Sequence, residues 1–126
     1  MPYSFQIDRK ARRLTIVGSD PVVLSDVLAL LDRQIAEGAW SFVTFHDARL
    51  VTWLPTPDDF GVIVAYVDNN SRTLGPRGSV AFVADGAAVT EVAKMYSQIG
   101  SGSALHAEVF GDADLATRWL DDQAST

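Results

Sequence analysis

The chain contains, between Trp40 and Val67, the sequence that decides its fold: the apolar run Phe42-Val43-Thr44-Phe45, then His46-Asp47, and, after a loop ending in Trp53-Leu54-Pro55, the turn Thr56-Pro57-Asp58-Asp59. The apolar run predicts a strand, and the proline and acidic residues after Thr56 are typical of a helix start. Ligands of open α/β sheets bind beyond the carboxyl ends of strands, against helix N-termini. We therefore expect any functional site to lie in this stretch.

The segments on either side predict further strands and helices. Alternating apolar residues at 3–7 and an apolar run at 14–18, separated by a basic turn, predict an N-terminal β-hairpin. Apolar runs at 80–84 and 105–110 predict two more strands. Apolar stripes with a helical period predict four helices, formed by Leu24, Val27, Leu28, Leu31 and Ile35; by Phe60, Ile63, Val64, Val67 and Leu74; by Val89, Val92, Ala93, Tyr96 and Ile99; and by Leu115, Ala116, Trp119 and Leu120.

This order of elements predicts an α/β fold. Right-handed crossovers turn the alternating strands and helices into a mostly parallel five-stranded sheet with four main helices. The hairpin places an antiparallel strand at one edge. With 126 residues and no segment that resembles an interdomain linker, we expect one domain over residues 1–126.

Composition and charge narrow the function classes. The formal net charge of −6, from 16 acidic and 10 basic side chains, argues against nucleic acid as a partner. The basic cluster Arg9-Lys10-Arg12-Arg13 is explained by a charged hairpin turn that protects a sheet edge. The chain has no cysteine for a disulfide or a thiolate metal site, which suits a reducing cytoplasm. Residues 1–6 lack the features of a signal peptide, and we find no apolar run long enough for a membrane span, so we expect a cytoplasmic protein without a membrane anchor.

The chain resembles the STAS superfamily, also called SpoIIAA-like, which comprises sulfate-transporter and anti-sigma-factor-antagonist domains and their small bacterial relatives. The resemblance covers nearly the whole chain and consists of element order and hydrophobic pattern. It is carried by the opening hairpin, by Phe42-Val43-Thr44-Phe45-His46-Asp47-Ala48-Arg49-Leu50-Val51, by the helix from Thr56, and by Ala107-Glu108-Val109-Phe110-Gly111-Asp112-Ala113-Asp114-Leu115-Ala116-Thr117-Arg118-Trp119-Leu120. It implies a STAS-like fold and a role in protein interaction or regulation.

In anti-sigma-factor antagonists, a partner kinase phosphorylates the first serine of an Asp-Ser-Ser-Gly motif at a helix start. By this resemblance Asp47 matches an earlier acidic position and Thr56 is equivalent to the phosphorylated serine. Pro55, Pro57 and Asp58 replace the rest of the motif, so it is not intact. Thr56, followed by proline and by Asp59 three residues on, has the pattern of a helix N-cap. Phosphate there would meet the repulsion of two carboxylates.

The acid–base candidates are weak. His46 and Asp47 at a strand end, with Asp85 and Asp112 after later strands, suggest a catalytic or metal-binding cluster. Neighbouring strand residues point to opposite faces, however, and a carboxylate after a strand more often caps the next helix. No nucleophile–base pair and no phosphate-binding glycine loop in the strand-to-helix order can be identified. We therefore expect no catalytic residues, no metal and no cofactor.

The remaining signal is apolar. Val62 and Tyr66 lie outside the core stripe of the long helix, and Trp53 and Leu54 precede it, which indicates a second hydrophobic surface. Such a surface indicates a partner, and homodimerisation through this helix or a sheet edge is the simplest explanation. Extra intramolecular packing and a small hydrophobic ligand under the Trp53 loop remain open.

Two functions follow from these observations. The first is a non-enzymatic STAS-like interaction module. The second is a binding protein for a small apolar or anionic ligand near His46, Trp53, Thr56 and Asp85. Among the six residues we selected in this region, Trp53 and Tyr66 are of more interest for binding than His46, Asp47, Thr56 or Asp85.

Overall fold

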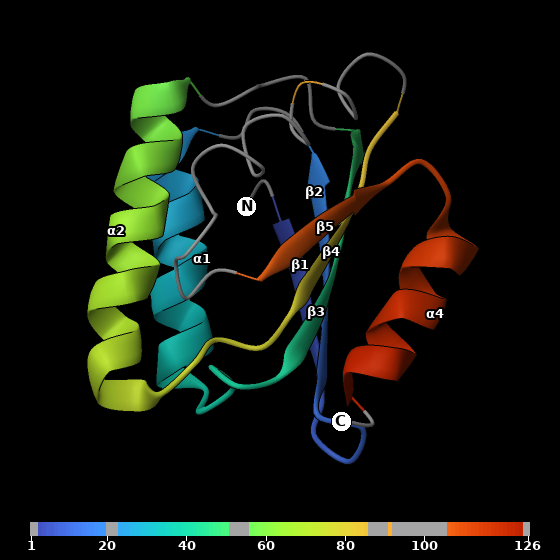
Figure 1. The fold of residues 1–126 in the computed structure, drawn as a ribbon, viewed down its shortest axis with the longest axis horizontal. Helices are drawn as coiled ribbons and strands as arrows, with labels where there is room; N and C mark the ends of the chain where they lie inside the picture. The colour runs from blue at the N-terminus through green and yellow to red at the C-terminus, as the bar shows by residue number, and fades with distance from the viewer. Residues whose placement is uncertain (1–2, 20–22, 51–55, 86–90, 92–105, 125–126) are drawn as a thin grey trace.

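The computed structural model describes residues 3–19, 23–50, 56–85, 91 and 106–124. They form a five-stranded mixed sheet with helices on both faces (Figure 1). The strands are β1 (Tyr3–Asp8), β2 (Arg13–Ser19), β3 (Val43–Leu50), β4 (Val80–Val83) and β5 (Ala107–Phe110). The helices are α1 (Leu24–Ala36), α2 (Pro57–Leu74) and α4 (Ala113–Ala124).

The strands lie in the sheet in the order in which they occur in the chain. β1 pairs antiparallel with β2, and the pairs β2–β3, β3–β4 and β4–β5 are parallel. The α/β class, the opening hairpin, the antiparallel edge strand and the mostly parallel sheet expected from the sequence are therefore confirmed.

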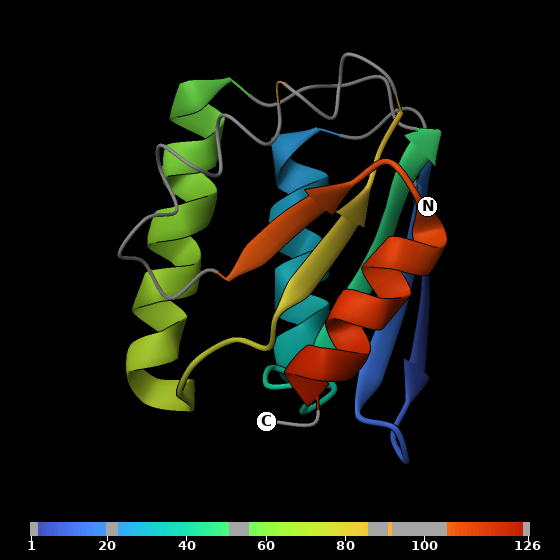
Figure 2. The ribbon, with the colours of Figure 1, turned by 45° about the vertical axis from the view of Figure 1, so that its right-hand side comes forward.

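The described helices cover the two faces of the sheet unequally. α1 and α2 lie on one face and α4 on the other, as Figure 2 shows from a second angle. The connections from β2 through α1 to β3 and from β3 through α2 to β4 run in the same direction across the sheet. Because such crossovers are right-handed, both helices lie on the same face. The described residues thus contain three helices where we expected four, since the stripe from Val89 to Ile99 lies, apart from Glu91, outside them. None of the described helices is both long and apolar enough to cross a membrane.

Strand β3 is longer than the sequence indicates. The apolar run ends at Phe45, but the strand continues to Leu50 and includes His46 and Asp47. The reason is pairing with neighbouring strands: His46 pairs with Ile16 of β2 and with Phe82 of β4, and Leu50 pairs with Ser19 of β2. This pairing outweighs the low strand propensity of a polar segment.

The core has two layers, one on each face of the sheet. Beneath α1 and α2, one cluster comprises Leu31, Trp40, Ile63, Val64 and Val67. Beneath α4, a second cluster comprises Val43, Ala81, Val83, Ala116 and Leu120. Since strand side chains alternate between faces, the second cluster shows that Val43 and Phe45 face α4, whereas Thr44 and His46 face α1 and α2.

A buried polar contact joins the helices to the sheet at the amino ends of the parallel strands. Gln34 of α1 is fully buried, and its Nε2 donates to the carbonyl oxygens of Ala39 (3.0 Å) and Trp40 (3.3 Å). Its Oε1 accepts from Nε (3.2 Å) and Nη2 (2.9 Å) of Arg77, which precedes β4. The Arg77 guanidinium lies 5.9 Å from the centre of the Trp40 ring. The contact ties α1, the turn before β3 and the turn before β4 together.

The basic hairpin turn is tied to both helical layers. Arg9 forms an ion pair with Glu37 at the end of α1 (3.0 Å) and donates to its carbonyl oxygen (3.1 Å). Arg13 forms an ion pair with Asp121 of α4 (2.6 Å). The basic turn therefore also contacts the ends of two helices, beyond the edge protection that we expected from its charge. These ion pairs are mostly exposed and each contributes at most about 1 kcal/mol.

Gly78 allows the turn before β4 to approach the turn before β3. A Cβ at this position would lie 2.0 Å from the carbonyl oxygen of Phe42, and the Gly78 N–H donates to the Trp40 carbonyl (3.0 Å). We expect Gly78→Ala to lower the free energy of unfolding by about 3 kcal/mol, the upper part of the range for overpacking, because backbone must move. Chemical denaturation measures the change.

Gly61→Ala is the matched control. Gly61 lies on the exposed side of α2, and a Cβ added there would have no other atom within 4 Å. This substitution should stabilise the protein by up to about 1 kcal/mol through helix propensity. Equal stability of the Gly78→Ala variant and the wild type would contradict the close approach.

Candidate functional site

The carboxyl ends of the parallel strands and the first turns of all three described helices meet at one edge of the sheet (Figure 1). We call it the carboxyl edge. It contains four of the residues selected from the sequence: His46, Asp47, Thr56 and Asp85. Trp53, the fifth, lies outside the described residues, and Tyr66, the sixth, lies halfway along α2.

His46 lies in an aromatic environment on the face covered by α1 and α2. Its ring stacks on Phe82 of β4, with centroids 4.8 Å apart and planes at 30°. The edge of Tyr3 from β1 approaches from the other side, at 6.0 Å and 73°. Burial, and secondarily the positive charge of Arg77, lower the pKa of His46 to about 4, against the opposing effect of Asp47. The imidazole is therefore neutral at physiological pH.

Tyr3 is also kept in its neutral form. Burial, assisted by the negative charge of Asp26, raises the pKa of its phenol to about 12. Tyr3, His46 and Phe82 thus form a half-buried set of rings, the aromatic cluster, that carries no net charge at neutral pH. Such a surface suits stacking with an apolar or aromatic group.

Asp47 points to the opposite face and is paired with a residue of its own strand. Nε and Nη2 of Arg49 donate to Oδ1 (3.0 Å) and Oδ2 (2.7 Å) of Asp47, and the Arg49 backbone N–H donates to Oδ1 (3.1 Å). The side-chain bonds to Arg49 are the largest cause that lowers the pKa of Asp47. The carboxylate is therefore a poor proton acceptor and does not converge with His46.

Arg49 is a residue of this edge that the sequence analysis missed. Asp47 is the main cause that raises its pKa, and Asp85 after β4 adds to the effect. The guanidinium therefore lies in the field of carboxylates from two neighbouring strands. A signal was available, since residues two apart in a strand share a face.

Thr56 is the N-cap of α2, as the sequence predicts. Its Oγ1 accepts from the backbone N–H of Asp59 (3.1 Å), and Oδ2 of Asp59 accepts from the backbone N–H of Thr56 (3.1 Å). Pro57 occupies the first helical turn. This reciprocal capping box explains Thr56 and Asp59 structurally. Thr56 is exposed, and its equivalence to a phosphorylated serine stays a prediction.

Tyr66 contributes to the contact between the two helices of one layer. Its hydroxyl donates to Oδ1 of Asp32 in α1, and its ring packs against the core cluster beneath them. The sequence analysis assigned Tyr66 to a binding surface. The structure shows a half-buried side chain with an intramolecular partner, so the exposed apolar residue of α2 near the carboxyl edge is Val62.

The structure brings together one nucleophile and one histidine, at the opposite edge of the sheet. Oγ of Ser79 lies 3.0 Å from Nδ1 of His106 and donates to Oε1 of Gln123 (3.3 Å). The contact with Gln123 ties Ser79 to α4. The His106 ring also contacts Trp119 at 5.4 Å, so the pair connects α4 to the sheet.

The described residues contain no group of three or more histidine, aspartate or glutamate side chains that could hold a metal ion. Comparison with known protein families, curated proteins and solved structures finds no match to this chain.

The lowered pKa of His46 predicts a pH dependence of stability. Between pH 6.5 and about 4 the unfolded chain binds a proton at this residue that the folded chain does not. The free energy of unfolding should therefore fall as the pH is lowered through this window, by at most about 1.4 kcal/mol per pH unit for one proton. Urea denaturation at a series of pH values measures it.

His46→Phe keeps a ring next to Phe82 and removes the titration. The difference between the wild-type and variant profiles isolates His46 from the other titrating groups, and this difference should lose its pH dependence well above pH 6.5. Asp47, whose pKa is lowered by its bonds to Arg49, is present in both proteins. Parallel wild-type and His46→Phe profiles between pH 4 and 6.5 would show that His46 has an ordinary pKa.

Proposed function

We propose that the chain is a non-enzymatic, STAS-like interaction module that binds a partner protein at the carboxyl edge of its sheet. The observation that carries this proposal is the presence there of exposed apolar side chains from three elements. Val23 at the start of α1 is 48% exposed, Leu50 at the end of β3 is 67% exposed, and Val62 near the start of α2 is 46% exposed. We call these three residues the docking surface.

Exposed apolar residues at one edge are typical of a protein contact. A single exposed valine needs no explanation, but side chains from separate elements at the same edge form the apolar part of a potential interface. Thr56 and Asp58, both exposed, provide polar groups next to it. An apolar centre with a polar rim is the usual anatomy of a transient protein interface.

The order of elements supports the STAS part of the proposal. An antiparallel hairpin, then parallel strands in chain order, a helix that starts at Thr56, and a final helix after β5 agree with the resemblance described above. The resemblance implies that a partner meets the start of this helix. The capping box keeps the helix start formed without phosphorylation, so we propose binding that requires no phosphate on Thr56. The absence of cysteine suits a cytoplasmic setting.

The aromatic cluster supports a second candidate function, the binding of a small apolar molecule. Tyr3, His46 and Phe82 are only partly buried, and two of them carry polar atoms that are neutral at physiological pH. A flat apolar ligand could stack there without the cost of desolvating a charge.

Site-specific photocrosslinking tests the docking surface. A photoreactive amino acid at Ala65, an exposed α2 position one turn from Val62, should give a discrete crosslinked product in cells that make the protein. Val62→Asp should reduce the product by about tenfold or more, because a charge would be buried at the interface.

Leu115→Asp is the matched control, because Leu115 is similarly exposed, at 52%, in the first turn of α4, on the opposite face of the sheet from Val62. It should leave the Ala65 product unchanged. If Val62→Asp and Leu115→Asp reduce the product equally, the loss comes from stability and the docking surface is wrong. The mass of the product shows whether the partner is another protein or a second copy.

Native mass spectrometry of freshly purified protein tests the ligand candidate. We expect an additional bound mass that is absent from His46→Ala, since this substitution removes the central ring of the aromatic cluster. His106→Ala, which removes a histidine with an edge-to-face contact to Trp119 at the opposite edge, should retain the bound mass. A wild-type protein with no bound mass contradicts this second candidate.

A further inference from the structure

The charges of the molecule are separated along the direction of the parallel strands. At the carboxyl edge, the described charged residues are carboxylates with Arg49 as the exception: Asp26, Asp47, Asp58, Asp59, Asp85, Asp112 and Asp114. The carboxyl edge is therefore strongly negative.

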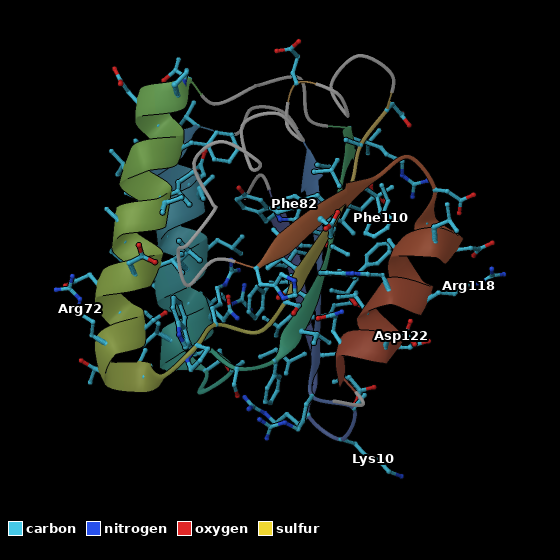
Figure 3. The ribbon with its side chains drawn as sticks, in the orientation of Figure 1. Lys10, Arg72, Phe82, Phe110, Arg118 and Asp122 are labelled. Carbon is cyan, nitrogen blue, oxygen red and sulfur yellow. The ribbon has the colours of Figure 1, made fainter. Side chains whose placement is uncertain are left out.

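The opposite end of the molecule, the amino edge, is positive. It carries Arg9, Lys10, Arg12 and Arg13 in and beside the hairpin turn, Arg33 and Arg72 in the last turns of α1 and α2, and the buried Arg77. Its described carboxylates are fewer: Asp8, Glu37, Asp121 and Asp122. Figure 3 shows Lys10 on the hairpin turn and Arg72 on the lower half of α2, toward the same end of the molecule. Both side chains point away from the molecule.

Local structure explains why the charges lie where they do but does not remove them. Asp26, Asp59 and Asp112 accept hydrogen bonds from backbone N–H groups at helix starts. Acidic groups favour helix N-termini, and all described helices start at the same edge. A helix end contributes only about half a charge, however, so the carboxylates exceed the dipoles that they complement.

We propose that the negative carboxyl edge of one chain binds the positive amino edge of a second copy, so that the chains associate head to tail. The two edges point in opposite directions and cannot meet within one molecule. Each also exposes apolar side chains: Val23, Leu50 and Val62 at the carboxyl edge and Leu74, 44% exposed, at the amino edge. Such a heterologous contact leaves one free edge at each end of the assembly, so it extends with concentration.

Salt weakens the long-range repulsion between two negatively charged molecules more than the short-range attraction between their oppositely charged edges. Two copies, each with a formal charge of −6, repel one another at long range. At about 0.1 M salt the Debye length is about 10 Å, which screens the repulsion between whole molecules but leaves the attraction between groups in contact. At about 1 M salt the Debye length is about 3 Å, and most of that attraction is lost as well.

This inference goes beyond the proposed function, because the head-to-tail contact depends mainly on opposite charges, whereas binding at the docking surface depends on apolar residues. The two share the carboxyl edge, so a chain in a head-to-tail assembly has its docking surface covered. If the chains do not associate but Val62→Asp still abolishes crosslinking, only the head-to-tail inference is wrong. If the chains associate but Val62→Asp leaves crosslinking unchanged, only the docking surface is wrong.

Sedimentation velocity of the full chain tests the inference. At about 0.1 M salt the weight-average mass should rise above the monomer mass of 13.6 kDa with concentration, and at about 1 M salt it should return towards it. Lys10→Glu should weaken association by about tenfold. Arg118→Glu, the same charge change on the exposed middle of α4, should not, and Figure 3 shows that Arg118 lies away from the hairpin turn.

A mixing experiment identifies the head-to-tail geometry. One variant, Lys10→Glu with Arg72→Glu, has a disabled amino edge, and the other, Asp58→Lys with Asp85→Lys, has a disabled carboxyl edge. Each should be monomeric alone. Their equimolar mixture should form dimers and nothing larger, because each variant retains the edge that the other lacks.

Thermal denaturation shows whether each variant is folded. A milder double variant, Asp58→Asn with Asp85→Asn, removes the two negative charges without adding positive ones and should weaken association only partly. A wild-type chain that stays monomeric at both salt concentrations overturns the proposal. So does association of either double variant at wild-type strength, or a mixture that remains monomeric.

Discussion

The contact between Gln34 and Arg77 is the constraint on which the arrangement of the other elements depends. Gln34 is fully buried in α1, and each of its amide atoms has a partner on a different segment: two carbonyl groups before β3 and a guanidinium before β4. A buried amide costs free energy unless these hydrogen bonds form. The contact therefore fixes where α1 ends relative to two strands and, through Trp40, which donates to Gly75, where α2 ends as well.

The two edges of the sheet consequently have different roles. At the amino edge, buried polar contacts, a close backbone approach at Gly78 and the ion pairs of the hairpin hold the layers together. At the carboxyl edge, the polar groups are used locally, in the Asp47–Arg49 pair and the Thr56–Asp59 capping box. Apolar side chains remain exposed there. Contacts between layers are thus concentrated at the amino edge, whereas the polar contacts of the carboxyl edge are mostly between residues close in sequence.

Local sequence predicted what depends on neighbouring residues. Hydrophobic periodicity identified the sheet strands and the described helices, and spacing identified the cap at Thr56. Contacts between distant segments could not be predicted from local sequence. Ser79 before β4 contacts His106 before β5, and Tyr66 of α2 donates to Asp32 of α1. The end of β3 was misplaced at Phe45 because its pairing with β2 and β4 is not encoded in its own residues. The Asp47–Arg49 pair is different, since alternation along the strand could have revealed it.

The one-sided placement of α4 has a consequence for how the chain is made. Since the strands lie in chain order, each new strand finds its neighbour already synthesised, and α1 and α2 cover their face as they appear. Among the described elements, only α4 covers the face formed by Val43, Ala81 and Val83, and it docks there through Ala116 and Leu120. A chain interrupted after β5 presents an apolar sheet face to other nascent chains, which is a recognised route to aggregation. The final helix thus protects the newly made protein as much as it stabilises the finished one.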